Sequence, residues 1–170
     1  MVSGRRTLEV EGPLPPPTAE EVAAIEEELG ARLPAGFLEF LSSVNGGWLD
    51  YSFDVPVGGR GVPVSFHSLH HTRRPSMFRP SPGAMLHEIR AERRTKGVAR
   101  QLLPFASDGG ASVVFLDLTP EGNGRVVAYV EGLPGWDGDP ASAFVVLAPD
   151  FAGFVDGLYR NLEEPRRHGE

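Results

Sequence analysis

The hydrophobic period of this 170-residue chain changes near Trp48, and that change constrains the fold more than any single motif does. Before Trp48, apolar residues recur at helical spacing. After it, short apolar runs alternate with Gly-rich turns, as they do in hairpin strands, and helical spacing returns only after Phe151. Helices at both ends with hairpins between them predict a single-domain α+β fold, with helices packed on one side of a largely antiparallel sheet.

Two short helices are predicted in the N-terminal part. The first begins after Thr18, whose hydroxyl can pair with Glu21 in a capping box, and Gly30 can end it in the left-handed conformation. The second begins near Pro34, because proline lacks the amide that a first helical turn leaves unpaired, and it ends at Asn45-Gly46-Gly47. We expect these two helices to form an N-terminal helical hairpin that buries two apolar stripes.

Six strands are predicted in the middle of the chain, at residues 49–55, 62–66, 102–106, 113–118, 125–131 and 143–147. Residues 67–83 show no periodicity and are predicted to form a long loop, and residues 84–94 a short helix with a basic side. The apolar residues from Phe151 to Leu162 predict a closing amphipathic helix. We expect this C-terminal helix on the same side of the sheet as the helical hairpin.

The composition is that of an ordinary soluble domain, with 41% hydrophobic and 23% charged residues. No apolar run reaches the roughly 20 residues that a bilayer-spanning helix needs, so we expect no membrane contact. The absence of cysteine excludes disulfides, thiol nucleophiles and thiolate metal ligands, and the first residues lack the apolar stretch of a secretory signal. We expect a cytoplasmic protein with a flexible Pro-rich lead (1–17), one domain (18–162) and a polar tail (163–170).

The net charge of −7 hides three blocks of alternating sign. Residues 1–59 carry 3 basic and 10 acidic side chains, residues 60–100 carry 9 and 2, and residues 101–170 carry 4 and 11. The basic block could bind phosphate or nucleic acid through Arg73, Arg74, Arg90, Arg93 and Arg94. Because aromatic residues are few there, we favour an internal role, in which the block neutralises the carboxylates of the first helix, and nucleic acid is disfavoured as a partner.

No catalytic, cofactor or metal site is expected. The chain has no Gly-x-Ser-x-Gly elbow, and its Gly-rich segments join strands instead of opening a helix. The three histidines His67, His70 and His71 lie beside arginines that would oppose a cation, so a solvated loop is the favoured interpretation. The stretch 136–140 has two aspartates but lacks the later ligands of a calcium loop.

Several motifs occur together in an order that resembles the SUKH superfamily. The first helix ends in Leu-Gly and is followed by Leu-Pro, an aromatic residue and Phe-Leu, and Asn-Gly-Gly then closes the second helix. The quoted segments are 25–41, Asn45-Gly46-Gly47, Leu103-Pro104-Phe105-Ala106, Asp108-Gly109-Gly110, Phe115-Leu116-Asp117-Leu118, Ala143-Phe144 and Phe151-Ala152-Gly153-Phe154. Bacterial members are immunity proteins that neutralise toxin domains, and fungal relatives are cell-wall assembly regulators.

The resemblance implies a non-enzymatic protein that binds a protein partner, for which a basic nuclease- or deaminase-like toxin domain is the expected class. An acidic surface can steer such a domain and occupy the place of its phosphate substrate. The candidate contact residues are the carboxylates of turns and strands and the two tryptophans: Asp108, Glu121, Glu131, Asp137, Asp139, Trp48 and Trp136. For Trp48, packing in the core is the favoured alternative, whereas for Trp136 the two interpretations are balanced.

Overall fold

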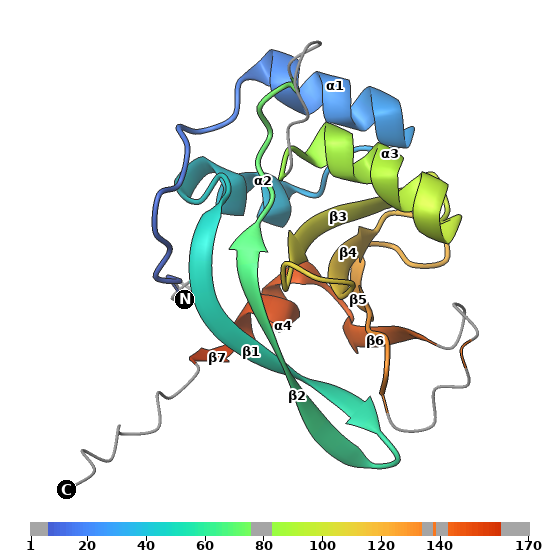
Figure 1. Ribbon diagram of the computed structural model, residues 1–170. Helices are drawn as coiled ribbons and strands as arrows, with labels where there is room; N and C mark the ends of the chain where they lie inside the picture. Colours follow the sequence, from blue (N-terminus) through green and yellow to red (C-terminus); the bar gives the residue numbers. More distant parts are fainter. Residues whose placement is uncertain (1–6, 76–82, 134–137, 139–142, 161–170) are drawn as a thin grey trace, which may run out of the picture.

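The computed structural model describes residues 7–75, 83–133, 138 and 143–160. Within these residues the chain forms four helices and one seven-stranded antiparallel sheet, which confirms the predicted α+β class (Figure 1). The elements in chain order are α1 (Ala19–Leu29), α2 (Ala35–Ser43), β1 (Gly47–Val57), β2 (Arg60–Leu69), α3 (Met85–Lys96), β3 (Leu102–Ser107), β4 (Val113–Asp117), β5 (Arg125–Tyr129), β6 (Phe144–Ala148), α4 (Phe151–Asp156) and β7 (Tyr159–Arg160).

The sheet is a meander in which each strand from β1 to β6 pairs with the next one along the chain. Its order is β6-β5-β4-β3-β2-β1-β7, and every neighbouring pair is antiparallel. The β1–β2 hairpin is much longer than the other strands and extends beyond β3, which pairs with β2 only at Ser68 and Leu69 (Figure 1). β1 also approaches β6 without pairing with it, as expected for a curled sheet.

One core joins the helices to one face of the sheet. All four helices contribute fully or nearly fully buried side chains to this cluster: Ile25, Leu29, Phe37, Leu41, Met85, Ile89, Phe151 and Phe154. The rings of Phe37, Phe105 and Phe151 meet edge to face, with centroids 5.1–5.8 Å apart. The helices therefore share one side of the sheet, as the sequence predicts, and we call the opposite side the outer face.

The outer face of the sheet carries a second, smaller apolar cluster. It consists of Val113, Phe115, Val127, Tyr129 and Ala143, with Val98, Leu102 and Phe144 packed against them. Residues 96–102, which begin at the last residue of α3, cover part of this cluster, and the ammonium of Lys96 lies 4.9 Å from the centre of the Tyr129 ring. The outer face is thus partly apolar and only partly covered.

The predicted start of α1 is confirmed. The Thr18 hydroxyl accepts a hydrogen bond from the Glu21 amide at 3.1 Å, and the Glu21 carboxylate accepts one from the Thr18 amide at 3.2 Å. Gly30 ends the helix with φ +67°, in the left-handed region that glycine adopts without strain.

The predicted closing helix is shorter than its apolar spacing suggests. α4 ends at Asp156, and the chain then returns to the sheet, where Tyr159 of β7 pairs with Ser52 of β1. Gly153 and Gly157 weaken helix propagation at this point, while Leu158 is still buried outside any helix. The apolar periodicity therefore predicts correctly which of these residues are buried, but not the backbone conformation after Asp156.

The Pro-rich lead, expected to be flexible, is attached to the domain in its described part. Glu11 and Trp48 exchange two backbone hydrogen bonds of 2.7 and 2.8 Å, the Leu14 amide donates to the Asn45 carbonyl, and Leu8 is buried in the core. Among the helices of the described residues, none is both long enough and apolar enough to cross a membrane.

Candidate partner-binding face

A row of directly paired residues crosses the outer face from β1 to β6. Directly opposite residues of antiparallel strands place their side chains on the same face, so the pairing identifies neighbours on that face. The row, which we call the outer row, consists of Trp48, Ser68, Ser107, Val113, Tyr129 and Phe144. In its polar half, the hydroxyls of Ser68 and Ser107 lie 2.9 Å apart.

Trp48 begins the outer row and is 64% exposed, so the favoured expectation that it packs in the core is wrong. The physical reason is strand alternation: Leu49, the next residue of β1, points into the core and is 6% exposed, which turns Trp48 to the outer face. A tryptophan at this exposure is a candidate anchor for a partner, because tryptophan is enriched among residues that dominate binding energy.

Two carboxylates lie next to Trp48 on the outer face. Glu11 is directly paired with it and is exposed, and Asp50, two residues along β1 on the same face, lies 3.7 Å from the His67 ring. Asp108 follows Ser107 of the outer row, and its carboxylate accepts a hydrogen bond of 2.7 Å from the Gly110 amide, which fixes the β3–β4 turn. The structure therefore places one of the predicted turn carboxylates at the same end of the sheet as Trp48.

The other predicted contact residues divide into three groups. Glu131 lies at the same end of the sheet, two residues after Tyr129, and accepts a hydrogen bond of 2.9 Å from the Tyr129 hydroxyl. Burial, together with this bond to Glu131, raises the pKa of the Tyr129 phenol. Glu121 is exposed in the β4–β5 turn, at the opposite end of β4. Trp136, Asp137 and Asp139 lie outside the described residues.

Part of the basic segment, residues 60–100, forms contacts within the molecule. Arg93 contacts the Glu28 carboxylate at 2.9 Å and the Glu28 carbonyl at 2.7 Å, and Arg90 lies 3.6 Å from the same carboxylate. Arg100 donates to the carbonyls of residues 27 and 28, so cationic groups cap the C-terminal end of α1. This arrangement matches the internal role expected for the segment. Of the other candidate anion ligands, Arg73, Arg74 and Arg94 are exposed.

The histidine-rich segment is not a solvated loop, which corrects that expectation. β2 continues through residue 69, His70 is 4% exposed, and its Nδ1 lies 3.1 Å from the Pro104 carbonyl. Burial lowers the pKa of His70 despite that carbonyl, and burial together with Arg73 lowers the pKa of His71. Within the described part of the chain, no three His, Cys, Asp or Glu residues are grouped as metal ligands would be.

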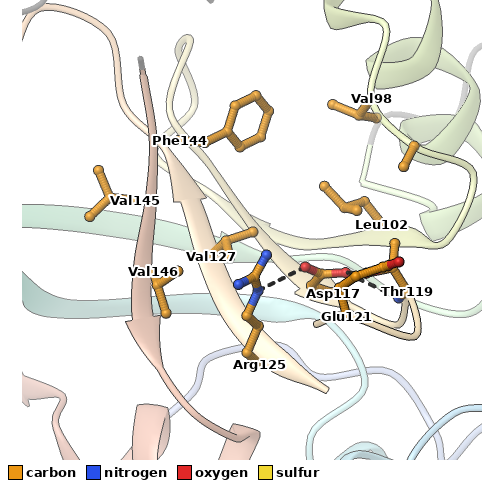
Figure 2. A pocket seen from close by; sticks show the side chains of 11 residues that line it. Val98, Leu102, Asp117, Thr119, Glu121, Arg125, Val127, Phe144, Val145 and Val146 are labelled. Carbon is orange, nitrogen blue, oxygen red and sulfur yellow. Dashed lines mark hydrogen bonds and ion pairs between the residues drawn. The ribbon is translucent and has the colours of Figure 1, made fainter. Parts of the chain in front are cut away.

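A groove that the sequence did not indicate lies on the outer face beside β6 (Figure 2). Its volume is about 430 Å³, and its apolar lining includes Val98, Leu102, Val127, Phe144 and Val146. At one end Asp117 and Arg125 form an ion pair of 2.9 Å, shown as a dashed line in Figure 2. Alternation along β6 could have suggested which residues share a face, but not that residues 96–102 leave this part of it uncovered.

The comparisons with known proteins agree with the fold. The model of the SMI1 / KNR4 family (SUKH-1) matches residues 16–157, from the end of the Pro-rich lead to the end of α4. No curated protein sequence matches the chain. The matched region includes Trp48, the outer row and the groove. Because the family model covers most of its length, the chain belongs to the SMI1 / KNR4 (SUKH-1) family, whose members have toxin-immunity or regulator-like roles.

Proposed function

We propose that this protein is an immunity-type binder that occludes a basic toxin domain of the nuclease or deaminase class, without catalysing a reaction. The observation that carries the proposal is the exposed Trp48 on the outer face, with Glu11 and Asp50 beside it. An aromatic anchor within a carboxylate surface suits a partner whose own site is built to bind phosphate. Family membership supports this general role.

The carboxylates contribute mainly to the rate and selectivity of association. Exposed negative charges attract a basic partner over a distance of about 8–10 Å at physiological salt and repel acidic ones. Trp48 then contributes buried apolar area once the surfaces meet. We include Asp108 and Glu131 in this contact face because they lie at the same end of the sheet, and we keep Glu121, Trp136, Asp137 and Asp139 as further proposed contacts.

The alternative, a regulatory module that binds phosphate or nucleic acid through residues 73–100, has weaker support. Arg90 and Arg93 already pair with Glu28, so using them for a ligand would leave that carboxylate without its cations. The exposed Arg73, Arg74 and Arg94 would have to carry such a function. Replacing these three by alanine should then abolish salt-dependent binding to a DNA duplex.

The proposal is tested by capturing partners from the native cell and measuring the dissociation constant of each captured protein. Trp48→Ala should weaken binding by about tenfold or more, as for a dominant interface residue. Asp50→Lys should slow association and reduce its dependence on salt, because it removes attraction for a basic surface. Matched controls are Tyr159→Ala, an aromatic that is 40% exposed on β7, and Glu27→Lys on α1. If both face variants bind as tightly as the controls, the proposed face is wrong.

A further inference from the structure

The strand β6 is an edge of the sheet, and its residues Phe144–Val146 pair regularly with β5 before a bulge at Leu147. Its residues Phe144–Ala148 are Phe-Val-Val-Leu-Ala, without charge or proline, and Val146 is 48% exposed. In the described part of the chain no strand pairs with its outward side. Apolar edge strands of this kind invite pairing with another strand, and proteins usually block them with charges, prolines or bulges.

The β1–β2 hairpin, in contrast, carries a proline on each of its outward sides. The β1–β2 hairpin turns at Gly58 and Gly59, both with positive φ, and Val57 faces Arg60 across the two-residue turn. This first pair is hydrogen-bonded, and along an antiparallel hairpin hydrogen-bonded pairs alternate with pairs that are not. Pro56 and Pro63 belong to pairs that are not hydrogen-bonded, so their backbone groups point away from the hairpin. Each outward side of the hairpin therefore carries a residue that has no N–H to offer another strand.

The register of β5 and β6 shows which backbone groups of β6 point outward. The Val130 amide donates to the Ala143 carbonyl at 2.9 Å, so Ala143 and, two residues later, Val145 direct their backbone groups toward β5. Phe144 and Val146 consequently direct their N–H and C=O groups away from the sheet. Their side chains lie on the outer face and line the groove (Figure 2).

We propose that two copies of this chain pair through β6, antiparallel, about a twofold axis that passes through Val145. In this register Phe144 of each copy forms a hydrogen-bonded pair with Val146 of the other, which satisfies the outward backbone groups of both residues. An aromatic residue opposite a β-branched residue is a favourable cross-strand pair, and the symmetry produces it twice.

The charges and the groove also favour a second copy as the occupant. Two copies of a chain with net charge −7 repel each other where like charges meet. Strand β6 has no charged residue, and Asp117 at the end of the groove is neutralised by Arg125, so this repulsion is small at the β6 edge. The apolar groove wall beside Phe144 gives the incoming Val146 side chain further surface to bury. Trp48 lies at the opposite end of the outer row and stays accessible.

Sedimentation velocity of the full-length chain over a range of concentrations tests the proposal. We expect a reversible dimer, and we expect Val146→Lys to lower its association constant by about tenfold or more, since it places two charges at the pairing edge. Val146→Pro should do the same while leaving the β5–β6 ladder intact, because the amide it removes points outward. Trp48→Lys, which places the same charge at another exposed apolar residue, should leave the dimer unchanged.

The register can be tested separately because the chain contains no cysteine. Under mild oxidation, Val145→Cys should form a covalent dimer faster than Phe144→Cys or Val146→Cys, because only residue 145 faces its own copy across the axis. A chain that is monomeric at all concentrations, a dimer that survives both Val146 variants, or one lost on Trp48→Lys would overturn the proposal. The proposal would also be overturned if the β6 edge paired with a strand of another protein or with another segment of this chain.

Discussion

Asn45 and Thr72, 27 residues apart in sequence, exchange two hydrogen bonds in the interior. The Thr72 amide donates to Asn45 Oδ1, and Asn45 Nδ2 donates to Thr72 Oγ1, both at 2.9 Å. Asn45 Nδ2 also donates to the Pro15 carbonyl at 2.9 Å, and Thr72 Oγ1 donates to the Glu21 carboxylate at 3.0 Å. The asparagine of the Asn-Gly-Gly motif therefore ties together the Pro-rich lead, α1, the end of α2 and the segment after β2.

Asn45→Ala should lower the free energy of unfolding by about 2–4 kcal/mol, because it leaves the buried Thr72 amide and the Pro15 carbonyl without their partners. Urea denaturation followed by circular dichroism measures this loss. Ser43→Ala, at an exposed position nearby, is the control and should change stability by less than about 0.5 kcal/mol. Equal stability of the two variants would show that water replaces the asparagine without cost.

Stability should fall as the pH drops below about 6.5, through His70. Burial lowers the pKa of His70 in the folded state below its ordinary value of 6.5, so the folded protein holds this ring neutral while the unfolded chain takes up a proton. The stabilising contribution is complete above pH 6.5 and is lost as the pH falls from there toward the folded-state pKa. The lowered pKa of His71 acts in the same direction.

His70→Asn should flatten this pH dependence, since the asparagine amide can donate to the Pro104 carbonyl but does not titrate. The measurement is the urea midpoint between pH 7.5 and pH 5, on the wild type and the variant. Ser43→Ala, at an exposed position that does not titrate, is the control and should keep the wild-type slope. A slope that His70→Asn leaves unchanged would assign the pH dependence to other groups.

Local signals were sufficient to predict much of the fold. Thr18, Glu21 and Gly30 define both ends of α1 by their own side-chain and backbone chemistry, which needs no information about distant residues. The alternation of apolar and polar residues that predicts strands also predicts that neighbouring side chains face opposite sides of the sheet. Which of those sides is covered depends on the packing of other segments, and for this reason Trp48 was expected in the core.

The outcomes for His70 and α4 show the same limit. His70 is polar and lies among arginines and histidines in sequence, yet it is buried because β2 continues to Leu69 and places the next residue beside the Pro104 carbonyl. α4 ends early because β1 offers an edge with which Tyr159 can pair, a contact of high sequence separation. The groove beside β6 likewise depends on where residues 96–102 settle.

Opening the protected hairpin edges should create a new route to association. In the Val146→Lys background, replacing Pro56 and Pro63 by valine restores an outward N–H on each side of the β1–β2 hairpin and raises strand propensity. We expect concentration-dependent oligomers in sedimentation velocity, whereas Val146→Lys alone should remain monomeric. A double proline variant that also stays monomeric would show that twist, and not the missing amides, protects this hairpin.

The pair of adjacent arginines Arg93 and Arg94 offers a matched test of the internal role of the basic segment. Arg93→Ala removes the 2.9 Å contact with the Glu28 carboxylate and the donor to the Glu28 carbonyl, so it should lower the free energy of unfolding by about 1–3 kcal/mol. Arg94→Ala removes the same charge from an exposed position and should change it by less than about 0.5 kcal/mol. Arg93→Lys should restore little of the lost stability, because an ammonium cannot reach both groups as the guanidinium fork does.

Thermal unfolding at low and at high salt separates the two contributions of Arg93: the part due to the ion pair should shrink with salt, and the part due to the carbonyl bond should remain. If Arg93→Ala and Arg94→Ala were equally stable, Arg93 would be free to serve an external ligand.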